Sequence, residues 1–89
     1  MNCYKVANRY ETEIVYITSR KKAVAEVKRM LGGEPDGAYS IIEDGTVEYA
    51  NDKQVKRMLQ GYFDDCVFAI GTRGGYYNKS VSVTAIKVK

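Results

Sequence analysis

A run from residue 19 to residue 31 repeats its apolar residues at the spacing of an amphipathic helix. These residues are Ala23, Val24, Val27, Met30 and Leu31. They would share one side of a helix, because residues three or four apart lie on the same face. Thr18 or Ser19 offers a hydroxyl that caps the start, and Gly32 can take the left-handed conformation that ends a helix. The pattern predicts a first helix over residues 19–31.

Residues 51–63 show the same spacing. The apolar positions are Val55, Met58, Leu59, Tyr62 and Phe63. Asn51 is expected to cap this segment, and Gln54 stands three residues later, where it completes a capping box. We therefore predict a second helix from Asn51 onward, which Gly61 is placed to end or fray.

The remaining apolar segments are rich in Val, Ile, Tyr, Phe and Thr, which favour strands. Residues 3–18, with a polar break at 8–12, predict one hairpin, and residues 38–50 predict another. The second contains Asp44-Gly45, a dipeptide that suits a two-residue turn. Segments 66–73 and 80–88 are the last two strands. The order ββαββαββ predicts a single α+β domain over residues 1–89, with two helices on one face of a mainly antiparallel sheet.

Five letters recur within the two predicted helices. Residues 27–31 and residues 55–59 both read Val-Lys-Arg-Met-Leu. Duplication of a ββα unit would produce this repeated sequence. The same letters also suit any amphipathic helix, so convergence remains the alternative.

Length and cysteine content restrict the class of protein. Eighty-nine residues supply one hydrophobic core. No apolar run is long enough to span a bilayer, and the first residues lack the layout of a signal peptide. Cys3 and Cys66 are far apart, and a secreted domain of this size more often carries four or six cysteines. We expect two reduced thiols in a cytosolic protein; a disulfide between neighbouring strands is the alternative.

The sequence contains few residues that could act in catalysis or bind a metal. The chain has no histidine, which removes the commonest general base and metal ligand. The acidic pairs at 43–44 and 64–65 are better explained by a turn and a polar link than by acid–base catalysis. The glycine-rich residues 71–75 join two predicted strands, whereas nucleotide loops lead into a helix. We expect no enzyme activity, no cofactor and no metal.

Charge is unevenly distributed along the chain. The net charge is only +3, but residues 33–52 hold six acidic residues and no basic one. The helices are expected to direct their bases outward: Lys21, Lys22, Lys28 and Arg29 on the first, and Lys53, Lys56 and Arg57 on the second. Such bases normally solvate an amphipathic helix, although together they would also form a surface that follows a phosphate backbone.

The loop at residues 73–79 is the first candidate for partner contact. It carries Arg73, Tyr76, Tyr77 and Lys79. Two adjacent tyrosines cannot both point inward from a strand, so at least one should be exposed. Tyrosine and arginine are typical anchors of protein interfaces, and they also stack on unpaired bases. The alternative is that Tyr76 and Tyr77 only pack within their own hairpin.

The second face of the sheet is the other candidate. Residues 14–17 and 41–42 are apolar at consecutive positions, which indicates that the face away from the helices meets a partner or a second copy of the chain. We therefore expect a non-enzymatic domain, adaptor or inhibitor-like, that binds another protein or itself as a homodimer, and no membrane. The alternative is a nucleic-acid-binding module that uses the basic helix faces and exposed tyrosines.

Overall fold

The computed structural model describes residues 2–41, 44–62, 65–71 and 79–87. Its elements are β1 (Asn2–Asn8), β2 (Ile14–Ile17), α1 (Arg20–Leu31), β3 (Gly37–Ile41), β4 (Val47–Tyr49), α2 (Asp52–Met58), β5 (Cys66–Ile70) and β6 (Lys79–Lys87). The order ββαββαββ and the single α+β domain are confirmed.

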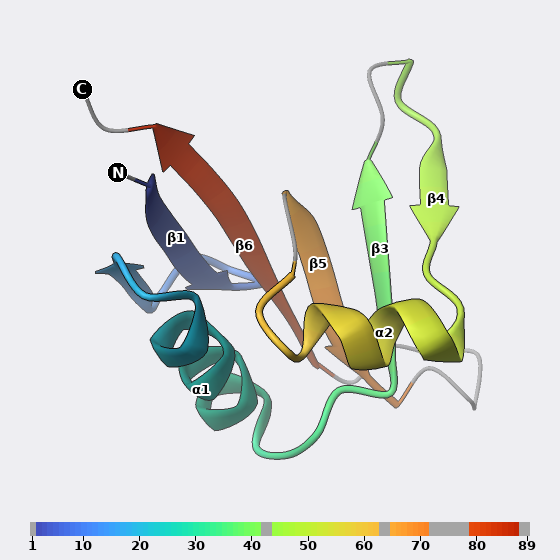
Figure 1. Ribbon diagram of the computed structural model, residues 1–89, viewed down its shortest axis with the longest axis horizontal. Coiled ribbons are helices and arrows are strands. Elements are labelled where there is room, and N and C mark those ends of the chain that lie inside the picture. Colours follow the sequence, from blue (N-terminus) through green and yellow to red (C-terminus); the bar gives the residue numbers. More distant parts are fainter. Residues whose placement is uncertain (1, 42–43, 63–64, 72–78, 88–89) are drawn as a thin grey trace.

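The strands form one six-stranded sheet in the order β2-β1-β6-β5-β3-β4. Every neighbouring pair is antiparallel. Both helices lie on the same side of this sheet, α1 over the half that contains β1 and β6, and α2 beside β3 (Figure 1). The other side of the sheet carries no helix. The strands β2 and β4 are the two edges.

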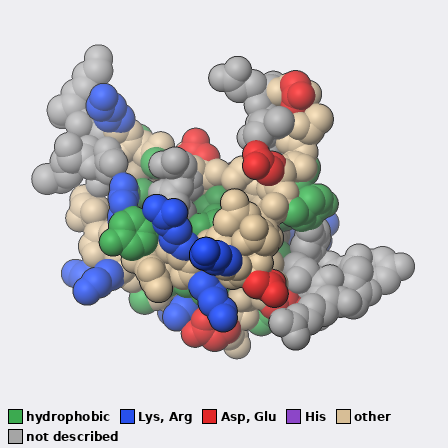
Figure 2. Space-filling view, turned by 45° about the vertical axis from the view of Figure 1, so that its right-hand side comes forward, with side chains coloured by type: hydrophobic (Ala, Val, Ile, Leu, Met, Phe, Trp, Pro, Cys, Tyr) green, Lys and Arg blue, Asp and Glu red, His purple; other side chains and the backbone are tan. Residues whose placement is uncertain are grey.

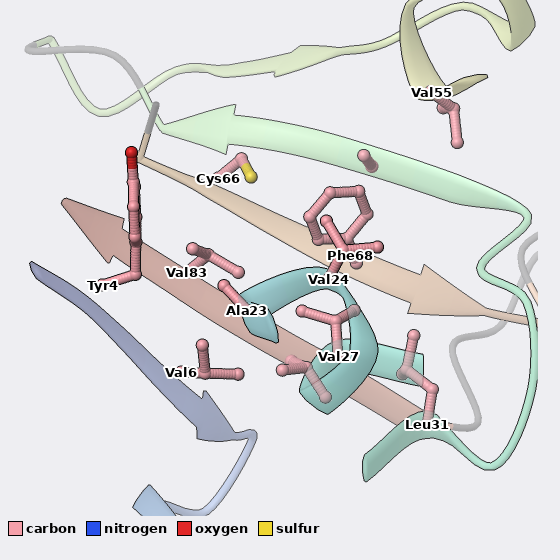
Figure 3. Packing of buried hydrophobic residues seen from close by; sticks show 12 residues of the cluster. Tyr4, Val6, Ala23, Val24, Val27, Leu31, Val55, Cys66, Phe68 and Val83 are labelled. Atoms are coloured by element: carbon pink, nitrogen blue, oxygen red, sulfur yellow. The ribbon is translucent and has the colours of Figure 1, made fainter. Parts of the chain in front are cut away.

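The hydrophobic core lies between the helices and the sheet. Phe68, Val6, Val27, Val81 and Val83 are its largest fully buried side chains. Figure 3 shows the side chains of α1 pointing toward those of β1, β5 and β6. Each fully buried side chain of this size contributes about 1.5–3 kcal/mol to folding. The core therefore depends on α1 more than on α2, which places only Val55 in it.

The helix boundaries follow the predicted caps. The Ser19 hydroxyl accepts a hydrogen bond from the Lys22 N–H at 3.3 Å. At the other end of α1, Gly32 has a φ of 78° and its N–H bonds back to the last turn. Asn51 and Gln54 form the predicted capping box, with both hydrogen bonds at 2.8 Å. These local predictions are confirmed.

The second helix ends before Gly61, the residue predicted to end or fray it, and its apolar stripe does not continue to Tyr62. The helix α2 stops at Met58, with Leu59 as its C-cap, and does not reach residue 63. The cause lies at Gly61, whose φ of 92° turns the chain away from a helical path. Tyr62 is consequently 60% exposed rather than part of the apolar stripe. Phe63 lies outside the described residues.

The predicted two-residue turn at Asp44-Gly45 is wrong. A turn of that length would place Ile41 opposite Glu48, whereas Ile41 lies opposite Val47. Residues 42–46 therefore connect the strands. Gly45 keeps the expected positive φ, 86°. The Asp44 carboxylate accepts hydrogen bonds from the hydroxyl and N–H of Thr46, at 2.7 and 2.9 Å, and these bonds lower the pKa of Asp44 below its ordinary value.

The arrangement of the two halves is compatible with the duplication suggested by the repeated letters. Val27 and Val55 are both buried, and Arg29 and Arg57 are both exposed. The units β1-β2-α1 and β3-β4-α2 occupy equivalent places at opposite ends of the sheet. Helix lengths differ, twelve residues against seven. Duplication stays a prediction until the two units are superposed.

The two cysteines cannot form a disulfide within the chain. Cys3 lies opposite Ile86 on the sheet face that carries no helix, whereas Cys66 is buried beneath the helices. Their strands are separated by β6. Neither cysteine belongs to a disulfide, and the alternative of a bridge between neighbouring strands is wrong. In the part of the chain that the structure describes, neither helix has the length and apolar content needed to cross a membrane.

Candidate functional site

The sheet face without helices gathers most of the exposed large apolar side chains of the described residues. These are Ile14, Tyr16, Val47, Tyr49 and Ile86. They point to this face because they alternate with residues such as Val15 and Val83 that point toward the helices. We call this surface the open face. Exposed apolar residues are ordinary when scattered, but a gathered set marks a binding surface.

A single row of side chains crosses the open face from edge to edge. The strand register aligns Ile14, Ala7, Ser82, Val67, Tyr39 and Tyr49, one residue from each strand. Bulky residues lie at both ends of the row, and small residues lie in its middle. The row therefore has an aromatic wall on the β3–β4 side and smaller side chains between this wall and Ile14.

The aromatic wall is formed by Tyr39 and Tyr49, which are opposite each other on β3 and β4. Their ring centroids are 6.0 Å apart and the rings are tilted by 54°. Tilted pairs at this separation attract each other, because the positive edge of one ring approaches the negative face of the other. The pair holds Tyr49 in place although 67% of its surface is exposed.

A hollow of about 290 Å³ lies between the aromatic wall and the turn after β1, lined by the open-face residues Tyr39, Val67, Ser80 and Ser82 and by Asn8, Arg9 and Glu11. The turn after β1 forms its rim. Asn8 holds this turn, because its side-chain oxygen accepts hydrogen bonds from the N–H groups of Thr12 and Glu13, at 2.9 and 3.2 Å. The hollow is large enough for a protruding side chain of a partner.

The open face is almost uncharged. Among its described strand residues, Lys5 is the one ionised side chain, and it forms an ion pair with Glu11 at 3.5 Å. Its polar groups are otherwise hydroxyls, from Ser80, Ser82, Thr84 and the tyrosines. Such a surface suits a partner that offers apolar contacts and hydrogen bonds, and it offers little attraction to a phosphate.

Exposed bases gather on the opposite, helical side of the molecule (Figure 2). Five of the seven predicted bases form no ion pair with another described residue: Lys21, Lys22, Lys53, Lys56 and Arg57. We call these five residues the basic helical surface. Arg57 also lies over the ring of Tyr62, 6.0 Å from its centroid.

The other two predicted bases, Lys28 and Arg29, form ion pairs with carboxylates. Lys28 Nζ lies 2.9 Å from Glu34, and Arg29 contacts Glu13 at 2.7 Å and Glu26 at 2.6 Å. The hydrogen bonds from Glu13 and Glu26 raise the pKa of the Arg29 guanidinium above its ordinary value. The continuous basic strip expected on α1 is therefore interrupted at its C-terminal end.

The predicted loop site lies largely outside the described residues, which exclude Arg73, Tyr76 and Tyr77. Lys79 is described and exposed. Its ammonium is directed to the end of α1, because Nζ lies 3.8 Å from the position that a Cβ at Gly32 would occupy. A cation there is favoured by the negative end of the helix dipole. Lys79 thus lies on the helical side and not on the open face.

A second hollow, of about 330 Å³, lies between α2 and the edge of the sheet. Its lining includes Ser40, Glu48, Gln54, Arg57 and Tyr62. It lies on the helical side of the sheet, away from the open face, and like the first hollow it is bordered by one carboxylate and one guanidinium. In the described part of the chain, no group of three cysteine or carboxylate side chains is placed to hold a metal ion.

Sequence reasoning located the open face in general but missed the Tyr39–Tyr49 pair and the hollow. The alternation of residues 37–41 and 47–49 indicated that Tyr39 and Tyr49 each point to the same face as other alternate residues of their strand. That the two tyrosines lie opposite each other depends on the strand register.

Comparison of the chain with protein families, curated proteins and solved structures finds no match.

Proposed function

We propose that this chain is a non-enzymatic protein-binding domain, adaptor or inhibitor-like, that contacts its partner through the open face. The observation that supports the proposal most strongly is the gathering of Ile14, Tyr16, Val47, Tyr49 and Ile86 on one nearly uncharged face. Tyrosines supply large contact areas at a small entropic cost, and apolar residues surrounding them exclude water. We place the domain in the cytosol, where both cysteines would stay reduced.

The separation of tyrosines from bases favours protein over nucleic acid. Single-stranded nucleic acid is bound where aromatic side chains and bases share one surface, since stacking and phosphate contact occur along the same strand. Here Tyr16, Tyr39 and Tyr49 lie on the open face, and the basic helical surface lies on the other side of the sheet. Tyr62 lies beside Arg57 on the helical side and does not take part in this separation. One strand of nucleic acid cannot use both surfaces at once.

The partner should present a small apolar protrusion with few charges. The hollow on the open face accepts one side chain over Val67, Ser80 and Ser82. The exposed Tyr49 hydroxyl provides directional hydrogen bonding at the border. Residues 73–79 connect β5 to β6 and remain a predicted additional contact.

Affinity capture with purified variants tests the proposal. Tyr39→Ala with Tyr49→Ala removes the aromatic wall and should reduce the recovery of specific partners at least about tenfold, as loss of interface anchors does. The matched control, Lys53→Ala with Lys56→Ala on the basic helical surface, should capture the same proteins as the parent. Partners that survive the tyrosine changes but disappear with the lysine changes would refute the proposal.

Titration with labelled single- and double-stranded oligonucleotides separates this function from nucleic-acid binding. We expect weak binding at low salt that vanishes at moderate salt, because few phosphates can be neutralised at once. Tight binding that is abolished by Lys53→Glu with Arg57→Glu would instead support the alternative, a nucleic-acid-binding module on the helical side.

A further inference from the structure

The edge strand β2 lacks the protection that sheet edges usually carry. Natural edges are shielded by lysines, prolines, bulges or inward-pointing charges, because unpaired backbone groups recruit another strand. β2 reads Ile-Val-Tyr-Ile, with no charge, proline or glycine. Its burial alternates between exposed and half-buried, so neither of its faces is closed off.

The strand register shows which backbone groups of β2 point outward. The N–H of Asn8 donates to the C=O of Glu13 at 3.2 Å, so this opposed pair is a hydrogen-bonded one. Such pairs alternate along antiparallel strands. Val15 and Ile17 therefore direct their backbone groups to β1, and Ile14 and Tyr16 direct theirs to the free edge. An added strand must bond to these two residues.

We propose that a second copy of this chain adds its own β2 to this edge in antiparallel orientation. The outward groups permit a register in which Ile14 lies opposite Tyr16 of the second copy and Val15 lies opposite Val15. Both Ile14–Tyr16 pairs fall on the open face, where aliphatic and aromatic residues stabilise each other across strands. Two six-stranded sheets become one continuous sheet.

The charges beside β2 favour this antiparallel pairing with an identical strand. Glu11 and Glu13, which pair with Lys5 and Arg29 of their own chain but stay exposed, precede the strand. Arg20, Lys21 and Lys22 follow it. Antiparallel pairing brings the acidic end of each strand to the basic end of the other, twice by symmetry. Parallel pairing would bring like charges together. The strand and its flanks are thus complementary to a second copy of themselves.

The other edge strand, β4, does not have this property. The N–H of Ala50 donates to the C=O of Ala38 at 2.9 Å, so by the same alternation Val47 and Tyr49 direct their backbone groups outward. Self-pairing through these two residues would place Glu48 opposite Glu48 of the second copy. Like charges in directly opposed positions are destabilising. The structure therefore assigns self-association to one edge only.

Sedimentation of the purified chain over a wide concentration range tests this proposal. The parent should be a dimer, and Tyr16→Lys should weaken dimerisation at least about tenfold by placing a cation at the paired edge. Tyr49→Lys is the matched control, since Tyr16 and Tyr49 are 63% and 67% exposed on the two edge strands. It should leave the dimer intact. A monomeric parent, or equal effects of both changes, would overturn the proposal.

Disulfide trapping gives a second measurement that does not depend on affinity. In a Cys3→Ser background, Val15→Cys should form a covalent dimer on mild oxidation, because opposed residues of a non-hydrogen-bonded pair have Cα atoms about 4.5 Å apart. Val47→Cys should stay monomeric. Trapping at residue 47 but not at residue 15 would contradict the proposed edge. Both tests use only the purified chain, so their failure leaves the proposed protein-binding function to its own experiment.

Discussion

Replacing Phe68 with alanine is expected to lower the free energy of unfolding by about 3–5 kcal/mol. Phe68 is the largest fully buried side chain of the core, and its strand β5 is one of the two central strands. Truncation removes its apolar contacts and leaves a cavity between the sheet and the helices. Because domains of this size have only about 5–15 kcal/mol of stability, a large part of the population would unfold on mild denaturation.

Urea denaturation followed by circular dichroism measures this loss. Ile86→Ala serves as the control, since Ile86 is an aliphatic residue on the open face and is 37% exposed. It should cost less than half as much as Phe68→Ala, because its side chain leaves no enclosed cavity. Equal losses at the two positions would mean that the open face is covered and that the assignment of the two faces is wrong.

Gly61→Ala is expected to destabilise the fold by about 2–3 kcal/mol, from two causes that add. The φ of 92° disfavours any residue with a Cβ. An added Cβ would also lie only 3.1 Å from the Cβ of Arg20, at the point where the segment after α2 meets the start of α1. The substitution therefore forces these segments apart.

Gly45→Ala separates the two causes. Gly45 has a similar φ, 86°, but no atom of the described residues lies within 4 Å of the Cβ position. Only the backbone strain remains, and the expected loss is about 1 kcal/mol. Thermal unfolding of both variants gives the comparison. A loss at Gly45 equal to that at Gly61 would show that contact with Arg20 contributes nothing.

The features that sequence predicted correctly are those determined by neighbouring residues. The caps at Ser19 and Asn51 act within three residues of each helix start, and the αL conformation of Gly32 acts within one turn of the end of α1. The order of elements follows from apolar spacing alone. These properties need no knowledge of distant contacts, so they can be derived from the chain directly.

The errors and omissions arose where distant segments decide the outcome. Gly61 was predicted to end or fray the second helix, but its contact with Arg20, far away in sequence, could not be predicted from the apolar spacing, which continues to Phe63. The Asp44-Gly45 dipeptide suited a short turn, but the register in which Ile41 opposes Val47 requires a longer connection. Arg29 is exposed, as predicted for an outward base, but its ion pair with Glu13 depends on the packing of α1 beside the first hairpin.

The sequence predicted that an apolar surface lies away from the helices, but it did not predict which residues of the six strands form that surface together. Consecutive apolar residues at 14–17 correctly indicated a surface away from the helices. The alignment of Ile14, Val67 and Tyr49 in one row depends on the pairing of all six strands. Whether the tyrosines and bases share a side depends on the same pairing. That separation is what leads us to propose protein rather than nucleic acid as the partner.

Site-specific photo-crosslinking in cells is the measurement that tests this account most directly. A photoreactive residue would replace Tyr49 on the open face in one variant and Lys53 on the basic helical surface in another; both positions are exposed. The account predicts a defined protein adduct from position 49 and none from position 53. An adduct formed from position 53 alone, or a nucleic-acid adduct from either position, would contradict it.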